Sequence, residues 1–336
     1  MAAVSNGRRV EIAREPASDW DASILPTSAE RLVVYHTTGW ARRMEEFLGY
    51  GTRFVTVYGD DGRPTLSLVL SIGWPLKVRG LGESARILLP ALTSARLGIM
   101  KWVGEPVLLS GDGEQDYLDL VDALKAYSRR WRLRMGAGAW PISYEGLLPD
   151  SWRAVRGATL LVDLSKSTEE IFAGFKSSAR KAIRRAERDG IRVRQVDSID
   201  DLRAYYRFAE NCSQRYRKRM HGVEDFESMW NHIRPEGHFE TFVAEHDGEP
   251  IAGLSVWGFG RTVGELGSFQ SERSFREKLF GPDLIKWKLM EWGHDQGLAL
   301  LDLSGVSPEP TNDKDASIRQ FKEKWGGQYY EYTYIG

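Results

Sequence analysis

The chain has 336 residues, of which 42% are hydrophobic, and its 46 basic residues nearly balance 47 acidic ones. This length predicts two domains rather than one, and a formal charge of −1 excludes a protein that coats nucleic acid with its whole surface. The single cysteine, Cys212, excludes an internal disulfide and falls at an apolar helix position, so we expect a buried structural thiol.

Membrane insertion and metal binding are not expected either. The opening residues contain no apolar segment of a secretion signal, and no run reaches the roughly 18 apolar residues that span a bilayer. The six histidines are scattered without the spacing of metal ligands. We therefore expect a cytoplasmic protein without a metal site.

The first half of the chain predicts a β-hairpin, a helix and a strand, in that order. Residues 54–73 form an apolar segment, an Asp-Gly turn and a second alternating segment, which is the pattern of two paired strands. Apolar residues at helical spacing predict a helix near 114–130, and an apolar segment near 133–140 predicts a strand.

The second half repeats this order, which favours an internal duplication. Residues 242–260 again have the hairpin pattern, a helix opens at Pro282 and stops at Gly297, and a strand follows. Hairpins are common, so chance similarity is the alternative. The shared order predicts one domain over residues 1–150 and a second over residues 151–336.

The start of the second half has the clearest helix signals. A strand over 159–164 leads into a helix at Ser167, where Glu170 completes a capping box, and Gly190 lies just past the helix end. A strand, a helix from Ser198 and the hairpin follow, and the chain ends in strand, helix, strand, helix and strand. This order resembles the acyltransferase core of the GNAT type. The predicted class is therefore α/β, with a mixed sheet in each of two GNAT-like domains, the first of them degenerate.

The helix in “FAGFKSSARKAIRRAERDG” predicts a basic ridge. Its apolar residues face a core, and four cations follow at steps of four along the edge of that face: Lys176, Arg180, Arg184 and Arg188. These cations repel one another, so an anion such as a polyphosphate would stabilise the ridge. The alternative is a solvated face whose partners come from elsewhere in the fold.

Two further basic clusters contain aromatic residues, “RRWRLR” over 129–134 and “RYRKRMHG” over 215–222. Each could contact an RNA backbone or lie on an ordinary surface.

The segment “IRQFKEKWGG” predicts a helix with an apolar stripe of Ile318, Phe321 and Trp325 and a lysine at the stripe's edge. With an aromatic neighbour on each side, Lys322 would hold its ammonium in a partly dry place, whereas Lys324 would be solvated. The simpler alternative is that Lys322 follows the apolar rim to reach water.

Three segments together resemble the Fem family of aminoacyltransferases, also called FemABX: “LVDLSKSTEEIFAGFKSSARKAIRRAERDGIRV”, “GPDLIKWKLMEWGHDQGLALLDLSGV” and “IRQFKEKWGGQ”. The resemblance covers most of residues 159–330 and is weaker in the first half. It implies two GNAT-like domains and transfer of an amino acid from aminoacyl-tRNA, as co-substrate, to an amine, typically on a UDP-linked peptidoglycan precursor. It implies no cofactor.

The resemblance also implies roles for particular residues. Phe321 and Lys322 match the family's Phe-Lys pair at the transfer site, and Arg180 and Arg184 match its basic helix, which contacts the precursor's phosphates. Arg43 falls near an N-terminal phosphate-binding lysine of the family. Two more residues of these motifs complete the candidate substrate-binding set: Lys176 and Trp325.

Two segments depart from the family pattern and leave the acceptor open. “WVGEPVLLSG” lacks the carboxylate that members commonly place after Gly-Pro-Val, and “TVGELGSFQ” lacks the tyrosines usual on the corresponding strand. The acceptor is a UDP-linked muropeptide, a lipid-linked precursor or a small amine of a biosynthetic pathway.

For the transfer itself we expect Lys322 to stabilise the negative charge that develops on the ester carbonyl oxygen as an amine attacks. One alternative is an acyl-CoA-dependent N-acyltransferase on the same core, although “REKLFGPDLIKW” offers one glycine followed by Pro282, which lacks an amide donor for a pyrophosphate. The other is a catalytically inactive protein that binds tRNA or a cell-envelope precursor.

Overall fold

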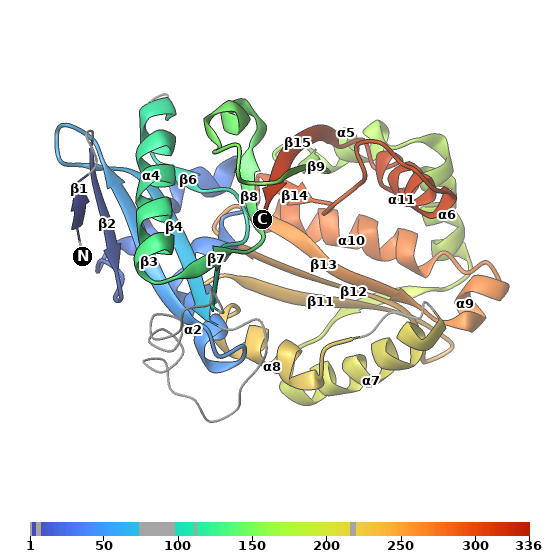
Figure 1. The fold of residues 1–336 in the computed structure, drawn as a ribbon. Helices are drawn as coiled ribbons and strands as arrows, with labels where there is room; N and C mark the ends of the chain where they lie inside the picture. Colours follow the sequence, from blue (N-terminus) through green and yellow to red (C-terminus); the bar gives the residue numbers. More distant parts are fainter. Residues whose placement is uncertain (1, 5–7, 74–97, 111–112, 216–219) are drawn as a thin grey trace. The chain divides into compact units, whose positions relative to one another are not determined.

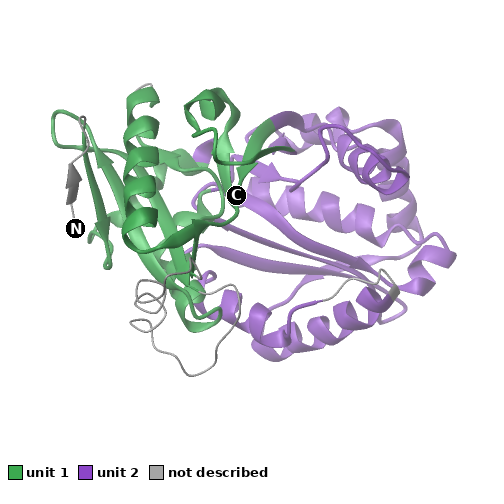
Figure 2. Cartoon of the chain, viewed as in Figure 1, with its two compact units in different colours: residues 1–28, 33–157, 331–336 green, residues 29–32, 158–330 purple. Residues whose placement is uncertain are grey.

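The computed structural model describes residues 2–4, 8–73, 98–110, 113–215 and 220–336 (Figure 1). The chain forms two compact units, and each is described by itself (Figure 2). Unit 1 comprises residues 1–28, 33–157 and 331–336, and unit 2 comprises residues 29–32 and 158–330. The predicted boundary near residue 150 lies close to the passage from unit 1 to unit 2 after residue 157. The sequence did not predict that residues 29–32 belong to unit 2 and residues 331–336 to unit 1.

Unit 1 is built on a mostly antiparallel sheet. In sheet order its strands are β1 (Ala2–Val4), β2 (Arg9–Ala13), β3 (Gly51–Tyr58), β4 (Pro64–Gly73), β5 (Gly98–Lys101) and β7 (Leu133–Met135), with β6 (Val107–Leu108) also paired to β4. β5 and β7 are parallel. The remaining strand, β8 (Gly138–Pro141), pairs with residues 332–335 at the end of the chain.

The helices of unit 1 include the predicted one, α4 (Glu114–Arg130), which packs Tyr117, Leu120 and Leu124 into the core against the sheet. The predicted hairpin is confirmed, whereas the single strand predicted near 133–140 is divided into β7 and β8, which belong to different sheets. The sequence reasoning did not predict the short elements: α1 (Trp20–Ile24), η1 (Pro26–Ala29), η2 (Val34–His36), α2 (Thr38–Glu46) and η3 (Ile142–Leu147).

Unit 2 contains a second mixed sheet. In sheet order its strands are β10 (Arg192–Gln195), β11 (His238–His246), β12 (Glu249–Phe259), β13 (Thr262–Gln270), β14 (Leu300–Asp302) and β9 (Ala154–Asp163). The last strand of the chain is β15 (Gln328–Ile335). At the β11–β12 turn, Asp247 and Gly248 both have positive φ, at 55° and 78°, which the predicted Asp-Gly turn requires.

Helices cover both faces of this sheet (Figure 1). They are α5 (Thr168–Gly174), α6 (Ser177–Arg188), α7 (Ile199–Arg215), α8 (Val223–His232), α9 (Glu272–Arg276), α10 (Gly281–Asp295) and α11 (Asp313–Glu323). Within the described residues, none of the helices is both long and apolar enough to traverse a bilayer. Cys212 is buried in α7, as predicted.

The helix predicted between Ser167 and Gly190 is wrong in one respect, because it breaks into α5 and α6 at Phe175. The Phe175 backbone is extended, and its ring is buried with its edge toward Trp287 and Trp325, at centroid distances of 5.6 and 5.2 Å. Burial of this ring outweighs continuation of the helix. The capping box of Ser167 and Glu170 is confirmed.

The two units share one topology, which confirms the predicted duplication. In unit 1, β2, β3, β4 and β5 pair antiparallel in turn, and β5 then pairs parallel with β7 after α4. In unit 2, β10 to β13 pair antiparallel in turn, and β13 then pairs parallel with β14 after α10. The class is therefore α/β with two mixed sheets, as predicted.

Candidate active site

Two neighbouring strands of unit 2 separate where the candidate site begins. β13 and β14 pair only through Thr262–Gly264 and Leu300–Asp302, and β13 then continues to Gln270 beside β12 alone. A register shift opposite Ser255 and Val256 lies just beyond this pairing, near Glu265. Such bulges redirect side chains and often occur next to active sites.

Lys322 reaches this region from α11. Its Nζ donates hydrogen bonds of 2.9 Å to the carbonyl oxygens of Ser304 and Gly305, which follow β14. Burial lowers the pKa of Lys322 to about 8, and the Asp302 carboxylate opposes this effect. The ammonium is therefore half-buried and held by backbone acceptors, not extended along the rim into water.

Asp302 lies beside this lysine at the end of β14. Its carboxylate accepts hydrogen bonds from the Thr159 hydroxyl and from the Ser304 amide, the latter at 2.7 Å. Burial raises the pKa of Asp302, while these two donors and Lys322 favour the charged form. This is the aspartate of the “LALLDL” strand.

A buried ion pair lies in the same unit. Lys286 of α10 is 4% exposed and contacts the carboxylate of Glu265 of β13, which is 10% exposed. Burial lowers the pKa of Lys286 well below its usual value, as do the ammonium groups of Lys322 and Lys324. Three lysines thus act on one another electrostatically within one region of unit 2.

The expectation that aromatic rings enclose Lys322 and leave Lys324 solvated is wrong. The Lys324 ammonium lies over the Phe321 ring at 4.0 Å and near the Trp325 ring at 4.9 Å. It also pairs with Asp283 of α10 at 2.5 Å. Burial raises the pKa of Asp283, and Lys324 opposes this effect. Lys324 keeps helical backbone angles at the end of α11 and lies three residues after Phe321, so the two side chains share one face of the helix.

The predicted apolar stripe of α11 also needs correction. Ile318 and Phe321 are 37% and 38% exposed, and only Trp325 is buried, at 1%. Trp325 belongs to the core of unit 2, so it supports the end of α11 and does not face a substrate. Phe321 remains on the surface beside the lysines, where a substrate can contact it.

The Gly-Gly after Trp325 has a steric reason. Gly326 has a φ of 73°, and a side chain there would meet the Gly174 carbonyl oxygen at 2.7 Å. The backbone amide of Lys176 also donates to the Lys324 carbonyl at 2.9 Å. The motif thus joins the end of α11 to the junction between α5 and α6.

The basic ridge on α6 is partly occupied by contacts of its own. Arg180 Nη1 donates to the carbonyl oxygens of Ala173 and Phe175, so this arginine caps the end of α5. The Lys176 ammonium lies 3.6 Å from Glu323, and Arg184 lies over the Phe172 ring at 5.7 Å. Arg184 and Arg188 are exposed. Arg180 therefore has a structural partner, as the solvated-face alternative expects, whereas Arg184 and Arg188 face solvent and remain accessible to an anion.

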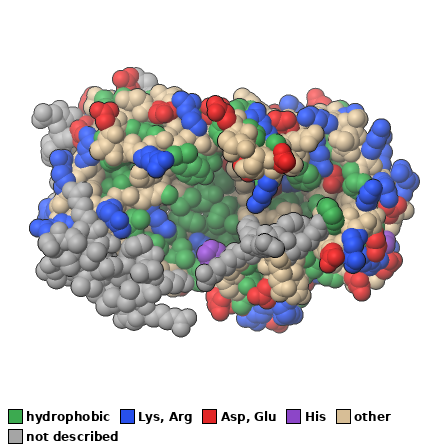
Figure 3. Space-filling model, turned by 45° about the vertical axis from the view of Figure 1, so that its right-hand side comes forward, with side chains coloured by type: hydrophobic (Ala, Val, Ile, Leu, Met, Phe, Trp, Pro, Cys, Tyr) green, Lys and Arg blue, Asp and Glu red, His purple; other side chains and the backbone are tan. Residues whose placement is uncertain are grey.

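In the 129–134 cluster the arginines are exposed and Leu133 is buried, so its contact with RNA stays a prediction. Figure 3 shows acidic and basic side chains interspersed over the visible face. Part of the 215–222 cluster lies outside the described residues.

Arg43, the remaining candidate, belongs to unit 1. It lies in α2, is 5% exposed, and its guanidinium lies over the rings of Trp40 at 4.9 Å and Phe47 at 5.6 Å. The phosphate-binding role of Arg43 stays a prediction.

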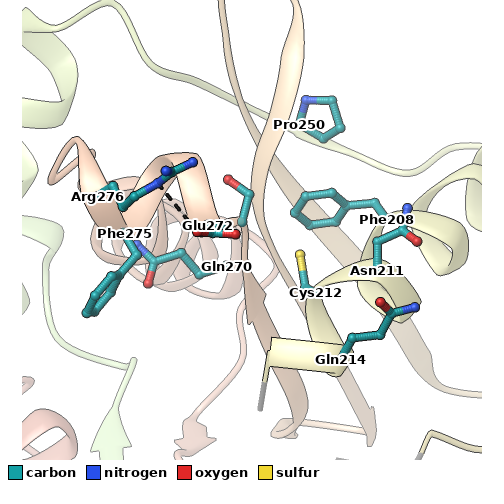
Figure 4. A pocket seen from close by; sticks show the side chains of 10 residues that line it. Phe208, Asn211, Cys212, Gln214, Pro250, Gln270, Glu272, Phe275 and Arg276 are labelled. Carbon is teal, nitrogen blue, oxygen red and sulfur yellow. Dashed lines mark ion pairs between the residues drawn. The ribbon is translucent and has the colours of Figure 1, made fainter. Parts of the chain in front are cut away.

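A cavity of about 740 Å³ lies elsewhere in unit 2, between α7 and the end of β13 with α9. Figure 4 shows Phe208 and Cys212 from α7 on one side, and the Arg276–Glu272 ion pair of α9 on the other. The described lining of this cavity includes none of the sequence-predicted site residues.

Sequence reasoning missed four charged residues of the site: Glu265, Asp283, Lys286 and Asp302. A usable signal existed for Lys286, which sits among Leu284, Ile285, Trp287 and Leu289 in a helix that is apolar on most sides. A lysine in such surroundings is rarely buried without a partner. The partner, Glu265, lies on a different strand and could not be identified from spacing.

Comparison with known proteins supports the family resemblance. A family model described as an acetyltransferase (GNAT) domain matches residues 173–322. Over 141 residues the chain is 23% identical to the UDP-N-acetylmuramoylpentapeptide-lysine N(6)-alanyltransferase of Weissella viridescens. That stretch covers 41% of this chain and 40% of the relative, so the match spans less than half of either protein.

Solved structures extend the likeness over the whole chain at the level of fold. The crystal structure of FemX is matched with a TM-score of 0.71 at 14% identity, covering 97% of both chains. The structure of L-PGS from Bacillus licheniformis is matched with a TM-score of 0.57 at 15% identity, covering 97% of this chain and 93% of that one. The GNAT-domain match and the FemX-like fold show that this chain has a GNAT-like fold, and the alanyltransferase relative supports its resemblance to the Fem family.

Proposed function

We propose that this chain is an acyltransferase that moves an amino acid from aminoacyl-tRNA to an amine of a peptidoglycan precursor, forming an amide bond. The observation that carries the proposal is the position of Lys322. Its ammonium is half-buried at the point where β13 and β14 separate, and two backbone carbonyls fix its direction.

A lysine ammonium has three N–H donors. Two of them bind the carbonyls of Ser304 and Gly305, so the third can donate to a substrate oxygen. A cation held in place before reaction needs no reorganisation when charge develops, and burial strengthens its effect. Lys322 is thus suited to stabilise an oxyanion.

The reaction balances without a covalent enzyme intermediate. The acceptor nitrogen forms a bond to the ester carbonyl carbon, the carbonyl oxygen becomes negatively charged beside Lys322, and the bond to the ribose oxygen of the tRNA then breaks. The proton lost by the amine ends on the ribose oxygen. The protein's contribution is to position the two substrates and to meet the negative charge.

The Weissella viridescens relative supports the acceptor class, because that protein is a UDP-N-acetylmuramoylpentapeptide-lysine alanyltransferase. Arg184 and Arg188 could bind phosphates of such an acceptor, since guanidinium groups bind phosphate oxygens in a bidentate way. A small amine is the alternative acceptor, because one segment in each unit departs from the family pattern.

The start of α10 argues against an acyl-CoA donor. Gly281 is buried, and a side chain there would meet Ile251, Ala252 and Ala244 at 3.0 to 3.3 Å. This glycine therefore serves close packing on the sheet, and Pro282 next to it offers no amide to a pyrophosphate.

The test is a single-turnover reaction with charged tRNAs and candidate amines, comparing wild type with Lys322→Met and with Lys314→Met. Lys314 is an exposed lysine of the same helix and serves as the matched control. We expect amide product in wild type and in the control only. Product from acetyl-CoA but not from any charged tRNA, together with a rise in melting temperature on adding CoA, would assign the chain to the CoA-dependent class.

A further inference from the structure

Ser304 has a backbone conformation that few residues other than glycine adopt. Its φ is 62°, in the left-handed region. A residue other than glycine, asparagine or aspartate is unfavourable there by roughly 1 kcal/mol or more, so the surrounding contacts must hold it in place. Such residues concentrate at functional sites, and here the residue lies next to Lys322.

The contacts of Ser304 account for its conformation. Its amide donates to Asp302 at 2.7 Å, its hydroxyl donates to the carbonyl oxygen of Glu265, and its own carbonyl accepts from Lys322 at 2.9 Å. The hydroxyl contact joins the end of β14 to β13 beyond the last paired residues, where the strands have no backbone pairing of their own.

The chain on both sides of Ser304 is held to β9. The Leu303 amide donates to the Leu160 carbonyl at 2.9 Å, and the Val306 amide donates to the Ala158 carbonyl at 2.7 Å. Between these anchors, the carbonyls of Ser304 and Gly305 both reach one ammonium. Successive carbonyls of an extended strand point in opposite directions, so the left-handed residue is what allows both to bind Lys322.

We propose that Ser304 is a positioning residue for the transfer reaction, whose hydroxyl tether to β13 keeps the 304–305 carbonyls directed at the Lys322 ammonium. This inference rests on the proposed role of Lys322. In this proposal Ser304 connects β13 to Lys322, and Lys322 in turn contacts the reacting oxygen of the substrate.

The experiment compares Ser304→Ala with Ser307→Ala. Ser307 is a serine of the same loop whose hydroxyl binds the Glu309 carbonyl, so it controls for general loop effects. Ser304→Gly is a third variant, which accepts the left-handed backbone and removes only the tether. We expect Ser304→Ala to reduce single-turnover transfer about tenfold with KM changed less than twofold, Ser304→Gly to lose less, and Ser307→Ala to match wild type.

A second readout does not depend on catalysis. Trace acetic anhydride labels neutral lysine amines, and mass spectrometry compares labelling of Lys322 with that of exposed Lys314 in the same helix. An ammonium that loses carbonyl acceptors becomes neutral more easily. We therefore expect Lys322 to be labelled about threefold faster in Ser304→Ala than in wild type, relative to Lys314.

The outcomes separate the two claims. Wild-type labelling and a wild-type rate in Ser304→Ala would overturn the positioning role. Faster labelling in Ser304→Ala, combined with full transfer by Lys322→Met, would support the positioning of the lysine and overturn its proposed catalytic role.

Discussion

Replacing Lys322 by methionine should separate activity from stability. Methionine keeps an unbranched side chain one atom shorter and removes the charge. The pKa of Lys322 is about 8 in the folded chain against an ordinary 10.5, so folding disfavours the charged form by about 3 kcal/mol. Loss of two charge-assisted hydrogen bonds works in the other direction by about 1.5 kcal/mol each. The net change at pH 7 is therefore within about 1 kcal/mol of zero.

The sign of the pH dependence follows from the same pKa. Because the folded-state pKa is below the unfolded one, the charged lysine opposes folding at pH values below about 8, and this opposition fades as the pH rises toward 10.5. The stability of Lys322→Met relative to wild type should thus be most favourable at pH 7 and should decline at pH 9.5. Transfer should fall by about 10² to 10³ at pH 7 and by less at pH 9.5, where the wild-type lysine is already mostly neutral.

Urea unfolding followed by tryptophan fluorescence measures the first quantity, with Lys314→Met as control, and single-turnover transfer measures the second. A loss of more than about 3 kcal/mol at pH 7 would show that Lys322 is mainly structural. Transfer at the wild-type rate by a stable variant would remove the ammonium from the mechanism.

Three further results are expected. Asp302 raises the pKa of Lys322, so Asp302→Asn should move the alkaline fall of transfer, expected near pH 8 in wild type, to lower pH; a pH–rate profile with an unmoved fall would contradict the contact. Lys324→Met leaves Asp283 buried without its cation and should lower the free energy of unfolding by about 2 kcal/mol, whereas Lys314→Met should leave urea unfolding unchanged. Arg184→Ala should raise the KM for a phosphate-bearing acceptor several-fold without changing the free energy of unfolding. Arg180→Ala should lower the free energy of unfolding by about 1 kcal/mol, because Arg180 caps α5. The opposite result for the two variants would exchange their roles.

Local signals in the sequence were enough for most of the fold. The Asp-Gly hairpins, the capping box at Ser167 and the Pro282 start of α10 each depend on residues close in the chain. The same signals did not reveal the break at Phe175, because the two tryptophans that bury its ring lie far along the chain.

The candidate site was predictable only in part. The helical pattern located Lys322, and the structure keeps it half-buried. The helical pattern could not predict the charged neighbours of Lys322, because the sheet and α10 bring Glu265, Lys286 and Asp302 together. Lys324 shows the same limit, because its partner Asp283 comes from α10 and lies 41 residues away in the sequence.

The final strand has a practical consequence for anyone who divides this protein. Residues 332–335 pair with β8, so the last six residues complete unit 1 although they follow unit 2 in the chain. A C-terminal truncation would therefore expose a strand edge in the half of the protein farthest away in sequence. Expression of the first half alone should give an aggregation-prone, poorly folded product unless the missing strand is supplied as a peptide or fused through a short linker.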